Sequence, residues 1–169
     1  IALMRVIPGM TIINPVDDLE TEAAIEAIME HDGPVYLRLG RLAVERIHEE
    51  KNPFVIGKAE TLTKGDDGTI IATGLMVQEA LAAQKKLAEQ GINVRLLNFS
   101  TIKPLDEELV IQAAAETPWI ITAEEHSVIG GLGSAVSELL SEIRPTKVVK
   151  VGVQDKFGQS GDPERLKDH

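Results

Sequence analysis

The stretch Glu124-Glu125-His126-Ser127-Val128-Ile129-Gly130-Gly131-Leu132-Gly133-Ser134-Ala135-Val136 decides how the second part of this chain folds. It follows an apolar run from Trp119 to Thr122, which predicts a strand, and it leads into an amphipathic helix. Between the two we expect a loop that carries two carboxylates, with three glycines at the start of the helix. Because glycine has no Cβ, these glycines allow another backbone to come very close. The stretch therefore indicates an α/β domain with a closely packed helix start.

The same alternation of strands and helices continues on both sides of this stretch. Runs of β-branched and aliphatic residues predict strands, and apolar residues at helical spacing predict helices. Five strands and three helices result: strands near 54–56, 69–73, 94–97, 119–122 and 148–151, and helices near 76–90, 106–116 and 132–143. This alternation is typical of a mostly parallel sheet with helices on both faces, so we predict a three-layer α/β/α fold.

Residues 1–47 form a separate, smaller unit in this prediction. Thr11–Ile13 and Val35–Leu39 are predicted strands on either side of a helix that begins near Asp17. This βαβ unit is too small to bury both faces of its sheet. Residues 48–53 are predicted to be a linker, followed by a second domain over 54–169. The first residues lack the pattern of a signal peptide and resemble the middle of a globular sequence, so we expect a piece of a longer polypeptide.

The composition argues against several classes of function. The formal net charge of −10 is the opposite of the basic stripe that binds nucleic acid, and it also disfavours anionic membrane surfaces. The absence of cysteine removes disulfides, thiolate chemistry and cysteine zinc sites. No apolar run approaches the ~20 residues of a membrane-spanning helix. We expect a cytoplasmic protein with neither nucleic acid nor membrane as a partner.

No complete catalytic or metal motif is present in the sequence. There is no G-x-S-x-G elbow, no P-loop and no H-x-x-x-H pair. From Gly131 the glycine cluster reads G-x-G-x-x-V, which fits a dinucleotide fingerprint poorly because no acidic residue follows about 20 residues later. We therefore predict no catalytic residue, cofactor-binding residue or metal ligand in this chain alone. Instead, the cluster predicts packing against another subunit or domain, through Glu125, His126, Gly130, Gly131 and Gly133.

Two arginines and one histidine allow two interpretations each. Arg38 and Arg41 lie at the carboxyl end of a predicted strand, where open α/β sheets place ligands. Their guanidinium groups match phosphate or carboxylate, but a surface ion pair would serve equally well in so acidic a chain. His126 follows two carboxylates, which can raise a histidine pKa toward physiological pH, and a charged loop at an interface explains it equally well.

From Lys64 onward the chain resembles the C-terminal domain of the transketolase superfamily, whose members are thiamine-diphosphate enzymes. Residues 1–41 are similar to the end of that superfamily's pyrimidine-binding domain. Several separated blocks, in the superfamily's order, carry the resemblance: 7–11, 15–17, 33–36, 65–74, 91–94, 102–106, 124–136 and 157–161.

Three branches of the superfamily compete. Transketolase is favoured by the run Phe157-Gly158-Gln159-Ser160-Gly161 and by the run 125–129. Deoxyxylulose-phosphate synthases share the Gly-Ser-Ala-Val ending and a two-arginine pattern, but they carry glycine where His126 stands. The β subunits of 2-oxo-acid dehydrogenases also carry glycine there, and an acidic residue in place of Ser134. We rank the three branches in this order.

The resemblance implies ketol transfer between sugar phosphates, as in the pentose phosphate pathway, with thiamine diphosphate and Mg²⁺ in the complete enzyme. It implies a sugar-phosphate anchor at Arg41, with Arg38 as a second candidate. However, the Gly-Asp-Gly…Asn signature for Mg²⁺ and diphosphate and the activating glutamate are missing.

These missing parts set what we expect of the chain by itself. We expect a largely structural domain, inactive alone and without cofactor, that forms a homodimer or a complex with an N-terminal transketolase section. A non-catalytic interaction or regulatory module with the same fold is the alternative from a different class.

Overall fold

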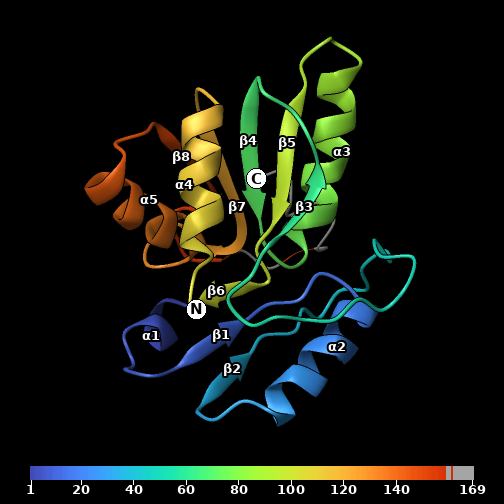
Figure 1. Ribbon diagram of the computed structural model, residues 1–169, viewed down its shortest axis with the longest axis vertical. Coiled ribbons are helices and arrows are strands. Elements are labelled where there is room, and N and C mark those ends of the chain that lie inside the picture. Colours follow the sequence, from blue (N-terminus) through green and yellow to red (C-terminus); the bar gives the residue numbers. More distant parts are fainter. Residues whose placement is uncertain (159–160, 162–169) are drawn as a thin grey trace.

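The structure is a computed structural model that describes residues 1–158 and 161 (Figure 1). Part of the 157–161 motif, namely Gln159 and Ser160, lies outside these residues. The elements follow one another in this order: α1 (Ala2–Arg5), β1 (Thr11–Ile13), α2 (Asp18–Met29), β2 (Val35–Leu37), β3 (Glu60–Thr63), β4 (Gly68–Ala72), α3 (Met76–Ala88), β5 (Val94–Asn98), β6 (Thr101–Lys103), α4 (Glu107–Glu116), β7 (Ile120–Ser127), α5 (Leu132–Ile143) and β8 (Val148–Val153).

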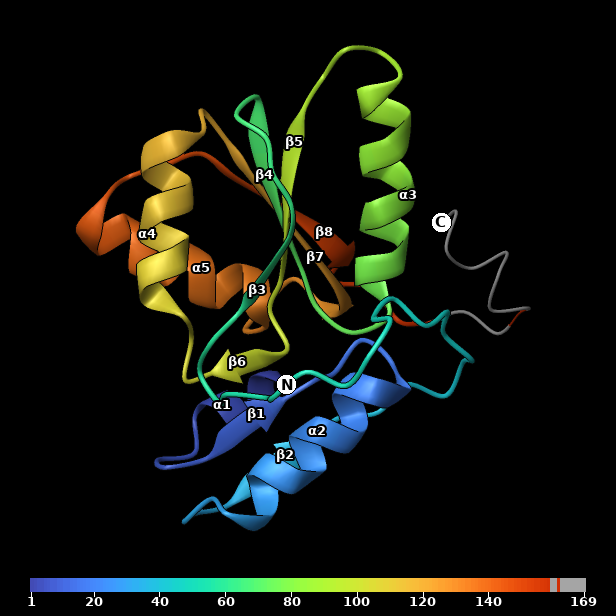
Figure 2. The same ribbon diagram turned by 45° about the vertical axis from the view of Figure 1, so that its right-hand side comes forward.

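The larger sheet has five strands in the order β3-β5-β4-β7-β8. Strands β5, β4, β7 and β8 run parallel, and β3 pairs antiparallel with β5 at the edge. Helices α4 and α5 cover one face of this sheet and α3 covers the other (Figure 2). Neighbouring residues of β4 face opposite sides, because Ile71 packs with α4 and α5 whereas Ile70 packs with α3. The predicted three-layer α/β/α fold is confirmed.

Two strands differ from the prediction. The fifth strand is β3 rather than the apolar run 54–56, which has no regular structure. Strand β7 does not stop at Thr122 but continues through Ser127, so Glu124 and His126 stand on a strand rather than in a loop. The extension is possible because the carboxylate of Glu124 is buried with hydrogen-bond partners, which compensates the cost of removing a charge from water.

A second, smaller sheet has the order β2-β1-β6. Strands β1 and β2 are parallel and joined by α2, which is the predicted βαβ unit. Asp17 caps α2 by accepting the N–H of Glu20, as its position before the apolar pattern indicates. Strand β6 was not predicted: it comes from the later part of the chain and pairs antiparallel with β1. Both parts of the chain therefore contribute to this sheet (Figure 1).

The division into domains at residues 47 and 54 stays a prediction. Residues 43–53 have irregular backbone, as a linker would. Across the part of the chain that the structure describes, no helix has the length and apolar character needed to cross a membrane.

Candidate functional site

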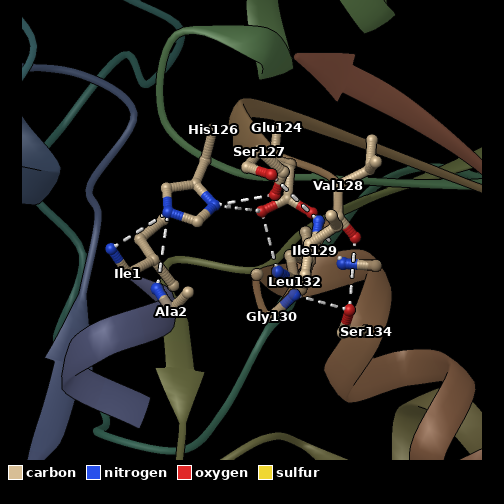
Figure 3. Close-up of polar contacts among 12 residues, drawn as sticks. Ile1, Ala2, Glu124, His126, Ser127, Val128, Ile129, Gly130, Leu132 and Ser134 are labelled. Atoms are coloured by element: carbon tan, nitrogen blue, oxygen red, sulfur yellow. Dashed lines mark hydrogen bonds and ion pairs between the residues drawn. The ribbon is translucent and has the colours of Figure 1, made fainter. Parts of the chain in front are cut away.

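The buried carboxylate of Glu124 holds the start of α5 (Figure 3). Glu124 is only 1% exposed, and its two carboxylate oxygens accept hydrogen bonds from the backbone N–H groups of Leu132 and Gly133, each at 2.8 Å. These N–H groups have no partner within the helix, and the positive end of the helix dipole favours a negative charge there. The end of β7 is thereby tied to the beginning of α5.

The glycines make room for this arrangement. A Cβ at Gly131 would overlap Oε2 of Glu124 and lie 2.7 Å from its Cδ. A Cβ at Gly133 would lie 2.6 Å from Oγ1 of Thr122. Gly130 has a φ of +77°, which glycine adopts without strain, and a Cβ there would meet Ala2 at 2.7 Å. The close approach inferred from the sequence therefore occurs within the chain, and contact of these glycines with another chain stays a prediction.

His126 links the same region to the first residues of the chain (Figure 3). Its Nδ1 lies 2.8 Å from the carbonyl oxygen of Ser127, which can only accept, so Nδ1 carries a proton. Its Nε2 is then free to accept the N–H of Ala2 at 3.4 Å. Burial lowers the pKa of His126 below the ordinary value, despite the nearby carboxylate of Glu124 at 3.7 Å. The structure thus holds a neutral histidine rather than one with a raised pKa.

Arg5 adds a second link between these regions. Its Nη1 donates to the carbonyl oxygen of Gly130 at 3.0 Å, and its Nη2 pairs with the carboxylate of Glu138 on α5 at 2.6 Å. The stretch 124–136 therefore packs against α1 of its own chain.

Arg38 and Glu125, both predicted as site residues, meet each other. Arg38 directly follows β2, and its Nη2 donates to the backbone carbonyl oxygen of Glu125 at 2.8 Å. The side-chain ion pair between them is longer, at 3.5 Å. The ion-pair interpretation of Arg38 is realised here, although 24% of its side chain remains exposed.

Arg38 and Arg41 line one cleft of about 750 Å³, which is formed mainly by α2 with the residues before it and by the segment 38–46, with Leu75 and Glu125 at its border. Arg41 is exposed, and within residues 1–158 and 161 it makes no ion pair or side-chain hydrogen bond. Arg46 also lines the cleft, but it is paired with Asp18. Arg41 is therefore a guanidinium that is available to a ligand, as the ligand interpretation requires.

A partly buried cluster around His48 was missed by the sequence analysis. His48 Nδ1 lies 2.8 Å from Oδ2 of Asp17, and Nε2 lies 2.8 Å from Oε2 of Glu60. Burial acts to lower the pKa of His48, but the hydrogen bonds to Glu60 and Asp17 outweigh it and the pKa is raised. Because both ring nitrogens face carboxylates, the protonated form suits this position. No local pattern could reveal a contact that joins the N-cap of α2, the irregular segment 43–53 and β3.

Glu20 extends the cluster toward the larger sheet. Its Oε1 accepts hydrogen bonds from Asn98 at 2.9 Å and from Ser100 at 2.6 Å, and burial raises its pKa. The cluster joins polar groups from both parts of the chain. Throughout the described part of the chain, no three acidic, histidine or cysteine side chains are grouped so that they could hold a metal ion.

Comparison with known proteins gives a consistent family. The family described as "Transketolase, C-terminal domain" matches residues 57–169. The 6-deoxy-6-sulfo-D-fructose transketolase subunit of Clostridium sp. (strain MSTE9) is 50% identical over 168 residues, covering 99% of this chain and 52% of that protein. An apulose-4-phosphate transketolase subunit of Phocaeicola vulgatus is 44% identical over 170 residues, covering 100% of this chain and 54% of that protein.

A solved structure gives the same result. The inactive β4 tetramer of a split gene transketolase superposes with a TM-score of 0.96 at 47% identity, over 99% of this chain and 55% of that one. The chain spans about half the length of the curated relatives it matches.

Proposed function

Because the chain belongs to the transketolase C-terminal domain family, we propose that it forms the C-terminal part of an enzyme that transfers a two-carbon ketol unit between sugars. The observation that carries this proposal is the likeness, over nearly the whole chain, to subunits named as transketolases. The names of those relatives contain a sulfonated sugar and a sugar phosphate. The proposed substrate class is therefore sugars that carry a terminal anionic group.

The residues of this chain do not by themselves fit the cofactor of such enzymes. The signature for Mg²⁺ and diphosphate is missing from the sequence, and the described residues offer no metal-binding group. When bound in the complete enzyme, thiamine diphosphate supplies the carbanion chemistry. We propose that its site is provided outside these residues.

Within the complete enzyme, the arginines of the cleft hold the anionic end of the sugar. Arg41 is the proposed anchor, since its guanidinium has no partner within the described residues and presents several N–H donors. Arg38 is the second candidate, because its side chain is 24% exposed and lines the same cleft. Holding the distant anionic end fixes where the reacting carbonyl lies, which lowers the entropic cost of the transfer.

The proposed partner is an N-terminal transketolase section, or a second copy of the complete polypeptide. The exposed apolar side chains around the smaller sheet support this, because such a surface needs to be covered. They are Leu3, Val6, Ile25, Met29 and Leu39.

The proposal is tested with the complete enzyme, assembled from the full polypeptide that contains these residues and its N-terminal section. We expect ketol transfer between phosphorylated or sulfonated sugars, and Arg41→Ala to raise the KM for the acceptor about tenfold or more with little change in kcat. Steady-state kinetics measures both. Calorimetry with this chain alone should detect no thiamine diphosphate binding. An assembled enzyme without ketol transfer, or micromolar cofactor binding by the isolated chain, would contradict the proposal.

A further inference from the structure

We propose that Glu125 determines the specificity of the Arg38–Arg41 cleft, because its carboxylate limits how strongly Arg38 attracts a doubly charged ligand group. The inference rests on the proposed function, in which this cleft receives the anionic end of a sugar. Glu125 stands on β7 of the larger sheet and Arg38 follows β2 of the smaller one, and both residues line the cleft.

The contacts separate the positional role of Glu125 from its charge. The short hydrogen bond, at 2.8 Å, runs from Arg38 Nη2 to the backbone carbonyl oxygen of Glu125, which any residue at this position provides. The carboxylate oxygen Oε2 lies 3.5 Å from both Nη1 and Nη2. The carboxylate therefore acts on Arg38 mainly through its charge, and the backbone holds the guanidinium in place.

Both side chains are accessible to a ligand. About a quarter of the Arg38 side chain and almost half of the Glu125 side chain are exposed, at 24% and 44%. A guanidinium has five N–H donors, so Arg38 can bind an anion while it keeps its bond to the backbone. An anion in that position lies close to the Glu125 carboxylate. The repulsion scales with the charge of the ligand, so it is about twice as large for a phosphate dianion as for a sulfonate.

The other acidic residues that line the cleft have cationic partners of their own. Asp17 contacts His48, Asp18 contacts Arg46, and Glu22 contacts Lys51. Among the residues that line the cleft, Glu125 is thus the carboxylate that interacts with a proposed anchor, Arg38.

Methyl phosphate and methanesulfonate are suitable probes, because at pH 8 the first is a dianion and the second a monoanion. Each is used as a competitive inhibitor of two forms of the complete enzyme, the unmodified protein and the Glu125→Gln variant. We expect Glu125→Gln to lower the inhibition constant of methyl phosphate about two- to fivefold and that of methanesulfonate by less. An inhibition constant that is unchanged or raised for methyl phosphate, or an equal change for both probes, overturns the inference.

Two further variants complete the experiment. Glu138→Gln removes a second ion pair between residues 1–47 and the larger sheet's domain, that with Arg5, and lies outside the cleft, so both inhibition constants should stay unchanged. Arg38→Ala and Arg41→Ala test the proposed function. If they weaken methyl phosphate binding while Glu125→Gln has no effect, only the present inference fails. If neither arginine variant affects the probes, the proposed anion site fails as well.

Discussion

At the scale of single residues, Gly131 shows how the absence of one side chain fixes the start of α5. We expect Gly131→Ala to destabilise the chain by about 2–3 kcal/mol, because the added Cβ displaces a buried carboxylate from two backbone hydrogen bonds. Urea unfolding followed by circular dichroism measures the change. Gly40→Ala is the matched control, since a Cβ at Gly40 meets nothing within 4 Å. Equal midpoints for the two variants would contradict this account.

The sequence predicts the local caps but not the buried carboxylate. Asp17 and Asp106 each precede an apolar helical pattern, which is typical of an N-cap, and both accept an N–H from the first turn. Glu124 caps α5 from β7, eight residues upstream of Leu132. From the sequence alone, a charged residue such as Glu124 is expected at the surface, because its hydrogen-bond partners cannot be seen there. The glycines are the usable signal, because their close spacing points to a close approach at this helix start.

At the scale of elements, His48 holds the irregular segment 43–53 between the start of α2 and β3. At pH 6 we expect His48→Gln to lower the free energy of unfolding by about 1.5–3 kcal/mol, through loss of two hydrogen bonds to carboxylates. Since the pKa of His48 is raised above 6.5, its contribution is complete below that pH and is lost as the pH rises through the raised value. The difference in the free energy of unfolding between the unmodified protein and the His48→Gln variant should therefore shrink between pH 6 and pH 9.

The control for this prediction is Lys51→Gln, in the same segment. Lys51 pairs with Glu22 and Glu26, and the pKa of Lys51 is raised above 10.5, so it stays charged over this range. The effect of Lys51→Gln on the free energy of unfolding should be small and nearly constant with pH. Urea titrations at each pH measure all three proteins. A difference for His48→Gln that grows with pH would exclude the ionic role of His48.

Elements with their own pattern were predicted, and elements that depend on distant partners were missed. Thr11–Ile13 and the run 69–73 are rich in β-branched residues and buried, so their composition alone indicates strands. By contrast, β3 lies at an exposed edge and consists of polar residues apart from the half-buried Leu62. Strand β6 has only three residues, and a proline follows it. Each of these two becomes a strand only by pairing with β5 or β1.

At the scale of the whole molecule, the predicted contact of the glycine stretch with another chain can be tested without disturbing the fold. Ile129 adjoins Gly130 and is 59% exposed, so Ile129→Glu leaves the interior packing unchanged. If this surface is covered by a partner, we expect the charge to weaken association tenfold or more, at about 1.4 kcal/mol per factor of ten. Analytical ultracentrifugation measures it. Ile143→Glu, at the other end of α5 and 58% exposed, should have no effect.

Strand β6 has a consequence for how the polypeptide tolerates a break. It lies between β5 and α4 in the chain, yet it is hydrogen-bonded to β1, and Lys103 also donates to the carbonyl oxygens of Arg5 and Ile7. A protease nick within residues 43–53 would therefore not release the N-terminal fragment, because shared sheet pairing keeps the two pieces together. A gene divided at that point would encode two polypeptides that complement each other by completing one β-sheet.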